Sequence, residues 1–439
     1  MRTSMIALAT TVACVTLAAP AAAQYDDQTK GTRNTQTTIR AQSGSSSKSE
    51  EKTKEQQAAD KLSTGRKLEL SKEARNAILE LQNAVNANDT ASIPAKLAAA
   101  QKAAKTVDDK FLIAVFQTKA ATTAGDLAGM RAGIDAMKAS GGADPADLVA
   151  RYNNLGKRHY DAKQLDLAAA AFNSALSVNA SNPDAMKMLA SIRDAQGRGA
   201  EAVTLMAKSI AATKAAGGKP KENDYKYAAR LAYDHKSPTA TEITRAWLAD
   251  YPTSTNWRDA LRVYRDIHGV SGEAKIDVLR LARAANALNG EADYFAYVSE
   301  LVTRGYLNEA KAVVAEAGAA KAIDPNKTVF KQFAPKFAKA PSRATIDAVA
   351  KLALSRPTGR EAMEAGDTLY GIGAFAEAVP LFKAAIAKGG VDKNRANLRL
   401  GMALARSGDK AGATVALNAV TGADAAIAKY WLIWVNSRA

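Results

Sequence analysis

A pattern of apolar and small residues returns at a fixed interval along this chain. In its first occurrence the interval is 34 residues, and the matched positions are Leu155 with Leu189, Gly156 with Ala190, Ala168 with Ala202, Phe172 with Met206, and Ala175 with Ser209. Near the C-terminus the interval is 35 residues, and the matched positions are Ala365 with Leu400, Gly366 with Gly401, Ala378 with Ala413, Phe382 with Leu417, and Ala385 with Val420. A period of this length is typical of helical repeat arrays, whose units bury their apolar faces by stacking on one another.

Each unit has the pattern of a helix, a short turn and a second helix. From Leu148 to Tyr160, large and small residues recur every three or four positions, which places them on one face of a helix. The polar segment 161–164 predicts a turn, and the alanine-rich segment 165–176 predicts a second helix that approaches the first closely. Asn182 and Pro183 then predict the N-cap and the first position of the next helix.

These residues resemble the tetratricopeptide repeat family, whose units carry Leu-Gly or Leu-Ala in the first helix and Ala, Phe and Ala in the second. Four units match, at about 149–182, 183–216, 359–393 and 394–427. The resemblance implies an all-α fold, an α-solenoid of stacked antiparallel helix pairs. Composition agrees with this class, because 6% aromatic residues suit thin stacked helices better than one thick core.

Composition and helix breaks divide the rest of the chain. The predicted organisation is a signal peptide at 1–23, a disordered polar linker at 24–60, N-terminal helical pairs at 61–148, two repeats at 149–216, degenerate helical repeats at 217–358, and C-terminal repeats with a capping helix at 359–439. The linker is inferred from its abundance of Gln, Thr, Ser, Lys and Glu. The apolar end at 430–435 is expected to fold over the last repeat, and the alternative is a docking surface for another subunit.

The N-terminus has the pattern of an export signal. Arg2 precedes an uncharged apolar stretch from Met5 to Ala19, and Ala21 and Ala23 are the small residues expected before cleavage at Gln24. A retained membrane anchor is the alternative, but the apolar stretch is shorter than the ~20 residues that a bilayer span needs. Cleavage after Ala23 predicts an exported protein, periplasmic or secreted, whose mature chain has no transmembrane segment.

Cysteine usage constrains the chemistry of the exported chain. Cys14 follows a short apolar segment, as in lipoproteins, yet the apolar stretch continues beyond it, which favours ordinary signal sequence. It is the single cysteine, so a chain cleaved after Ala23 would contain no cysteine. Disulfides, thiolate catalysis and cysteine-ligated metals would then be excluded.

The charge and the motifs argue against several function classes. The net charge of +16 would suit nucleic acid, but the export signal and the lack of basic runs interleaved with aromatic residues exclude that partner. Anionic envelope polymers, acidic membrane surfaces and acidic proteins remain, beside an ordinary solvated surface. His159, His235 and His268 have no metal-binding spacing, and no nucleophile elbow, phosphate loop or calcium loop occurs. We therefore expect no enzyme activity, cofactor or metal.

Candidate binding residues follow from the family resemblance. It implies that the first helix of each pair lines a concave groove, with solvent-facing positions around the residue after Gly or Ala. The strongest candidates are Asn153, Lys157, Tyr160, Lys187, Asp367 and Tyr370, and the further positions are Ser191, Asp194, Met363, Leu398, Met402 and Ala405. One subtype grips a terminal carboxylate with Asn directly after the Gly, whereas Lys157, Ser191, Asp367 and Met402 occupy that place here.

These observations predict a non-catalytic scaffold that binds a protein or peptide in an envelope assembly through its concave groove. The alternative is an accessory factor that binds an envelope polysaccharide or another anionic polymer through its basic surface.

Overall fold

The computed structural model describes residues 68–438, and every regular element in that range is helical. The chain divides into one unit that ends at Phe116 and a second that starts at Gln117. The predicted all-α fold is confirmed. The calls for a signal peptide at 1–23 and a linker at 24–60 lie outside the described residues. No described helix is long and apolar enough to cross a membrane.

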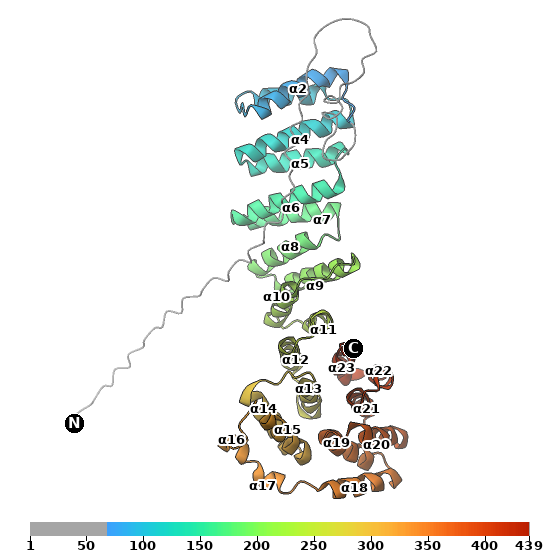
Figure 1. Ribbon diagram of the computed structural model, residues 1–439. Helices are drawn as coiled ribbons and strands as arrows, with labels where there is room; N and C mark the ends of the chain where they lie inside the picture. The colour runs from blue at the N-terminus through green and yellow to red at the C-terminus, as the bar shows by residue number, and fades with distance from the viewer. Residues whose placement is uncertain (1–67, 439) are drawn as a thin grey trace, which may run out of the picture. The chain divides into compact units, whose positions relative to one another are not determined.

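The described helices follow one another along the chain as Figure 1 labels them. They are α2 Lys72–Asn86, α3 Ile93–Ala103, α4 Val107–Ala124, α5 Leu127–Ser140, α6 Pro145–Asp161, α7 Leu165–Val178, α8 Pro183–Ala195, α9 Gly199–Ala215, α10 Glu222–Asp234, α11 Ala240–Asp250, α12 Ser254–His268, α13 Gly272–Ala284, α14 Gly290–Thr303, α15 Leu307–Ala319, α16 Thr328–Lys331, α17 Ala334–Phe337, α18 Arg343–Ser355, α19 Arg360–Gly371, α20 Phe375–Lys388, α21 Lys393–Ser407, α22 Lys410–Asn418, the 3-10 turn η1 Gly422–Asp424, and α23 Ala425–Asn436.

The first unit is organised around the buried carboxylate of Asp109. This carboxylate accepts hydrogen bonds from the Ser71 backbone N–H at 3.0 Å and hydroxyl at 2.7 Å, and from the backbone N–H groups of Lys105 and Thr106 at 2.9 Å each. Ser71 also caps α2 by accepting from the backbone N–H of Ala74. One buried side chain therefore connects the start of α2 to the start of α4.

The second unit begins with regular helix pairs, in which α6 packs on α7 and α8 packs on α9. The N-cap predicted at Asn182 is confirmed, because its side chain accepts from the backbone N–H of Ala185 at 2.8 Å and Pro183 starts α8. The two helices of a pair approach closely where a small residue of the first helix faces a large one of the second. A Cβ placed on Gly156 would lie 2.8 Å from Cζ of Phe172, so only glycine fits against this ring.

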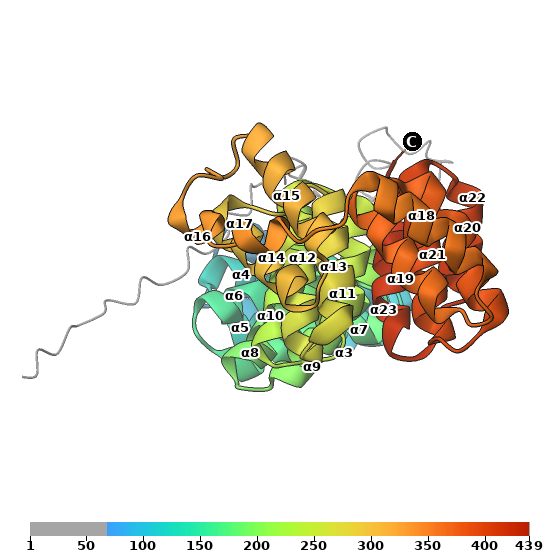
Figure 2. The same ribbon diagram turned by 90° about the horizontal axis from the view of Figure 1, so that it is seen from below.

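The C-terminal repeats pack back on the middle of the second unit. α19 lies against α15, and α23 lies against α11 and α13 as well as α22 (Figures 1 and 2). Tyr430 of α23 shares a 2.6 Å hydrogen bond with Thr244 of α11, and Trp434 donates to the Ala284 carbonyl oxygen at 3.1 Å. The stretch from 217 to 358, expected to be degenerate helix pairs, is helical throughout most of its length but includes α16 and α17, which have 4 residues each.

Candidate protein-binding surface

Three first helices, α6, α8 and α10, present neighbouring polar and aromatic side chains on one surface of the second unit. We call this set the α6–α8–α10 surface. Its members are Asn153, Lys157, Tyr160, Lys187, Ser191, Asp194, Asp224, Tyr227 and His235. All of them are at least partly accessible, whereas the apolar residues between them are buried in the helix pairs.

Side chains of α8 and α10 interact across this surface. Lys187 lies 3.6 Å from Asp224 and 3.1 Å from Asp184. Tyr227 donates a 3.4 Å hydrogen bond to the Ser191 hydroxyl, and burial raises the pKa of its own hydroxyl. Partly exposed ion pairs of this kind contribute little stability, about 0–1 kcal/mol each, so they leave the surface free to exchange partners.

The last turn of α8 adds a second crossing contact. His235 Nε2, just after α10, lies 3.1 Å from a carboxylate oxygen of Asp194. This contact between Asp194 and His235 connects α8 to the end of α10.

The α6 residues of the surface differ in how far they are engaged. Asn153 donates to the Asn182 side chain at 3.2 Å, so it supports the N-cap of α8. Lys157 is exposed, and no ion pair between described residues includes it. Tyr160 is partly exposed and lies near enough to Tyr227 to influence the pKa of that hydroxyl. Lys157 and Tyr160 are one helical turn apart, so a cation and an aromatic ring share one patch.

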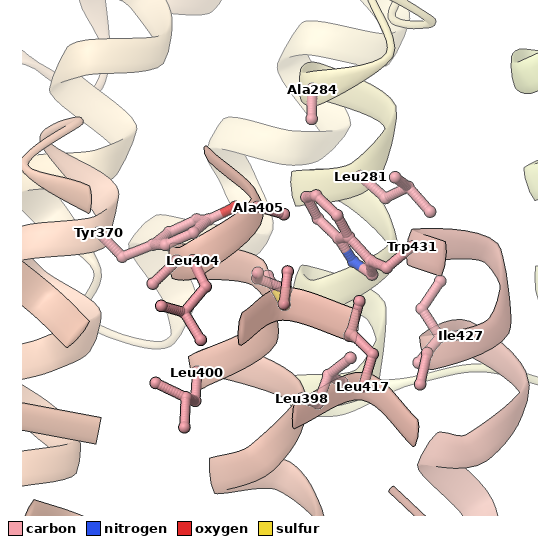
Figure 3. Packing of buried hydrophobic residues seen from close by; sticks show 14 of the residues in the cluster. Leu281, Ala284, Tyr370, Leu398, Leu400, Leu404, Ala405, Leu417, Ile427 and Trp431 are labelled. Atoms are coloured by element: carbon pink, nitrogen blue, oxygen red, sulfur yellow. The ribbon is translucent and has the colours of Figure 1, made fainter. Parts of the chain in front are cut away.

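The expected solvent exposure of the C-terminal groove residues is wrong for most of them. Met363 is partly exposed, but five positions are buried: Asp367, Tyr370, Leu398, Met402 and Ala405. The reason is that α15 packs on α19, and side chains of α13 reach both α19 and α21. Leu281 and Ala284 of α13 pack in one apolar cluster with Tyr370, Ala405 and Trp431 (Figure 3).

Asp367 belongs to a buried ionic cluster that joins α13 to α15, α19 and α21. Arg280 of α13 donates to Glu309 of α15 at 2.7 Å and to Asp367 of α19 at 3.2 Å. Arg399 of α21 donates to Asp277 of α13 at 3.2 Å and also to Asp367. All five side chains are almost completely buried, and their mutual pairing is what makes such burial tolerable.

Burial and pairing act in opposite directions on the pKa values of this cluster. Burial alone would raise the pKa of Glu309, but the Arg280 guanidinium holds it below its usual range. For Asp367, burial raises the pKa above its usual value despite the attraction of Arg399 and Arg280. Burial also raises the pKa of Tyr297, whose hydroxyl donates to Glu309 at 2.6 Å. These carboxylates are enclosed, so this cluster stabilises the fold and offers no ligand an entrance.

Tyr227 is a surface residue that the repeat pattern did not reveal. It lies 36 residues after Ser191, whereas the C-caps of α8 and α10, Gln196 and His235, are 39 residues apart, five more than the 34-residue period. Tyr227 is therefore not at the position that the repeat assigns to Ser191, and the period alone could not find it. Asp224 lies on α10, as Tyr227 does, and His235 follows the end of that helix. Neither residue has a counterpart in the recognised motif.

Two further observations concern the polar residues outside this surface. Among residues 68–438, no group of three or more His, Cys, Asp and Glu side chains is arranged to hold a metal ion. A cavity of about 580 Å³ lies beside the turn between α12 and α13, where Lys275 and Arg304 both pair with Glu300. Internal pairing of this kind is the pattern of a charged protein surface.

Comparison with known proteins agrees with this geometry. The fold and the stacked pairs define the chain as an all-helical repeat protein. Residues 153–217 and 363–426 match the tetratricopeptide repeat family, in agreement with the sequence pattern. Such repeats typically form non-catalytic scaffolds for protein interactions. No match was found among curated proteins.

Several solved structures share the helical-repeat character. A tetratricopeptide repeat protein from Parabacteroides merdae is 14% identical, over 67% of this chain and 99% of that chain, with a TM-score of 0.28. Pseudomonas aeruginosa pilF is 12% identical, over 60% and 97%, with a TM-score of 0.25. The C-terminal part of a repeat protein from Cytophaga hutchinsonii is 13% identical, over 74% and 99%, with a TM-score of 0.26. With TM-scores this low, these structures carry no argument about function.

Proposed function

We propose that this protein is a non-catalytic scaffold in the cell envelope, and that its α6–α8–α10 surface binds a segment of another protein. The observation that carries the proposal is the contrast between the two repeat segments. In the C-terminal segment most of the predicted groove residues are buried, whereas Lys157 and Tyr160 of the N-terminal segment remain accessible. A partner is therefore expected at α6, α8 and α10.

The chemistry of the surface suits a peptide with a carboxylate next to an apolar side chain. Lys157 supplies an exposed cation, and Tyr160 with Tyr227 supplies aromatic area at low cost in side-chain entropy. The packing of α6 on α7 and of α8 on α9 holds these helices in position, so Lys187 and Asp194 can exchange their partners for the peptide.

Replacement of both Lys157 and Tyr160 with Ala tests the surface. Residues at the centre of an interface typically contribute about 1–3 kcal/mol each when truncated, so partner affinity should fall at least tenfold. The matched control is Leu167→Ala with Lys208→Ala, which removes an exposed apolar side chain and an exposed lysine from second helices α7 and α9.

Photo-crosslinking in cells supplies the partner for this measurement. A crosslinking residue placed at position 157 should capture a defined protein, and one placed at position 167 should not. Equal capture from both positions, or full affinity of the Lys157/Tyr160 variant for the captured protein, would remove this surface from consideration.

The envelope location rests on the N-terminal sequence pattern. We propose that residues 1–23 direct export and are removed, so that the mature chain begins at Gln24. N-terminal sequencing of the exported protein tests this step. A retained N-terminus or a lipid on Cys14 would contradict it.

The alternative function, binding of an anionic envelope polymer through dispersed Lys and Arg, differs in its response to salt. Contacts to a polyanion weaken steeply as salt screens them, since the screening length falls to about 8 Å at physiological ionic strength. Binding anchored by Tyr160 should persist through the same titration. Loss of all partner binding at moderate salt would favour the polymer.

A further inference from the structure

An exposed apolar stripe runs along α18. This helix has 13 residues, and only Ile346 and Ala353 are buried. Val349 and Leu352 are 50% and 52% exposed. Four exposed residues are spaced i, i+3, i+4 and i+7 and so share one face: Thr345, Ala348, Val349 and Leu352. We call this face the α18 stripe.

The position of α18 in the array explains why this stripe is bare. α18 packs on α19 and α20, just as second helix α7 packs on the following first helix α8. In the regular pairs, a first helix of the same unit covers the second helix, as α6 covers α7. Immediately before α18 the chain forms the single-turn helix α17 and an irregular connection, in place of a full-length first helix (Figures 1 and 2). The α18 stripe therefore lies where a first helix would pack, and its residues are left exposed.

The segment of the chain that carries the stripe is basic. Between positions 327 and 360 the chain carries eight Lys or Arg residues and one acidic residue, Asp347. Arg343 pairs with Asp347 and with Glu377 of α20, and Lys327 pairs with Glu291 of α14, so these two cations are already neutralised. Four exposed lysines enter no ion pair between described residues: Lys331, Lys336, Lys339 and Lys351.

We propose that the α18 stripe is a docking site for an amphipathic helix of another protein, and that the polar face of this helix is acidic. The stripe has the Ala, Val and Leu composition of the buried seams within the helix pairs, and small residues such as Ala348 permit close approach. The excess of lysine selects the sign of the partner's charge. This docking site is separate from the α6–α8–α10 surface and does not depend on the function proposed for it.

Basic, apolar patches also bind anionic membranes. The side chains on and near α18 favour a partner helix over a membrane. Membrane-binding patches present aromatic rings to the lipid. Here Phe333 packs against Phe295 at 5.9 Å and against Phe337 at 6.1 Å between ring centroids, and Phe295 is 38% exposed. α18 itself contains no aromatic residue.

The test uses two designed helical peptides that match the length of α18. One carries Leu and Ala on one face and Glu on the other, and its twin carries Lys in place of Glu. Fluorescence anisotropy with the full mature chain should detect binding of the acidic peptide, at least tenfold tighter than the basic twin. Failure of the acidic peptide to bind would overturn the proposal, and so would equal binding of the two peptides.

Variants connect the binding to the stripe. Val349→Ser with Leu352→Ser should weaken binding of the acidic peptide at least tenfold, and Lys351→Glu should weaken it further. The matched control is Val415→Ser, because Val415 is 73% exposed on α22 and lies outside the stripe. Circular dichroism checks that each variant remains folded, which is expected because the changed side chains are exposed. The Lys157/Tyr160 variant should bind this peptide as wild type does.

Vesicles of phosphatidylglycerol and phosphatidylethanolamine supply the competing outcome. If the wild-type chain sediments with these vesicles, the Val349/Leu352 variant does not, and the acidic peptide fails to bind, the stripe is a membrane-binding surface. If the wild-type chain self-associates and the same variant does not, the stripe binds a second copy of the chain. Either result would overturn the proposal.

Discussion

Arg399 of α21 donates a hydrogen bond to Asp277 of α13 at 3.2 Å, across 122 positions of sequence. Both side chains are almost completely buried, so the contact is screened very little by solvent. It joins the last repeat segment to the middle of the second unit. An open solenoid connects only neighbouring repeats, whereas this contact makes the C-terminal half of the second unit one cooperative block.

Removal of a single guanidinium should therefore destabilise the whole block. Arg280→Met leaves Glu309 buried without its main partner and removes one of the two arginines that pair with Asp367. Loss of one member of a buried ion pair typically costs about 3–5 kcal/mol. Hydrogen exchange should rise together in α13, α15, α19 and α21, and should change little in α6 and α7. Exposed Arg158→Met on α6 is the matched control.

A second outcome is informative for the same variant. Faster exchange confined to α13 would contradict cooperative closure of the block. It would mean that α13 is held locally and that α19 and α21 are stable without it.

Replacement of the two tyrosines predicted as groove residues, Tyr160 and Tyr370, should change the free energy of unfolding by very different amounts. Tyr370 is 2% exposed, its ring packs edge-on against Phe375, and Arg280 lies 4.9 Å above it. Tyr370→Ala should cost about 3–5 kcal/mol in the free energy of unfolding, because it leaves a cavity beside the ionic cluster. Tyr160→Ala should stay within about 0.5 kcal/mol of wild type.

Urea denaturation of the two tyrosine variants measures this difference. A small effect of Tyr370→Ala would show that the surroundings of Tyr370 are not tightly packed. A large effect of Tyr160→Ala would make it a structural residue instead of a ligand contact.

Acid should loosen the first unit through Asp109. Burial raises the pKa of this carboxyl, but the hydrogen bonds from Thr106, Lys105 and Ser71 lower it below its usual value of 3.8. A depressed pKa in the folded state means that the stabilisation is present above the unfolded-state pKa. It is lost as pH falls through the folded-state value. Hydrogen exchange in α2, corrected for the intrinsic effect of pH, should therefore accelerate below about pH 4.

The substitution Asp109→Asn isolates this carboxylate. At neutral pH it should cost about 1–3 kcal/mol, because an amide nitrogen cannot accept the hydrogen bonds that the second carboxylate oxygen receives. The Asp109→Asn variant should also lose less stability in acid than wild type does. Glu80→Gln is the control, since Glu80 forms an exposed ion pair with Lys96. Equal acid sensitivity of Asp109→Asn and wild type would assign the effect to another group.

The sequence predicted the helix pairs because their signals are local. The N-cap at Asn182 and the Gly156 with Phe172 pairing involve residues within one or two helices of each other, and a period reports such contacts. The closure around α13 could not be predicted in this way. Asp277 and Arg280, spaced i and i+3 on one helix, have the pattern of a solvated charged face. Their partners lie in other helices, at distances along the chain that no repeat encodes.

The same limit explains the errors in the candidate site. Family geometry implies that groove positions face solvent, and it holds for Lys157, which is exposed on α6. It fails for Asp367, because α15 packs on α19 and Arg280 of α13 reaches this carboxylate. The stripe on α18 was not recognised for a related reason, since the absence of a first helix is visible only once the pairs have been assembled.

The last prediction concerns the small residue that each repeat carries in its first helix. Gly156→Ala should destabilise the α6–α7 pair although alanine favours helix by about 1 kcal/mol over glycine. The added Cβ would lie 2.8 Å from Cζ of Phe172, and overpacking of this kind typically costs about 1–3 kcal/mol.

The chain itself contains the compensating pair. In the next repeat Ala190 takes the place of glycine and Met206 takes the place of phenylalanine, and both are buried. Methionine is flexible enough to adapt to a neighbouring methyl group. Gly156→Ala combined with Phe172→Met should therefore be more stable than Gly156→Ala alone, although Phe172→Met alone loses packing area. A double-mutant cycle in urea should give a favourable coupling energy of about 0.5–3 kcal/mol. Additive effects of the two changes would show that the ring and the small residue are not in the close contact described above.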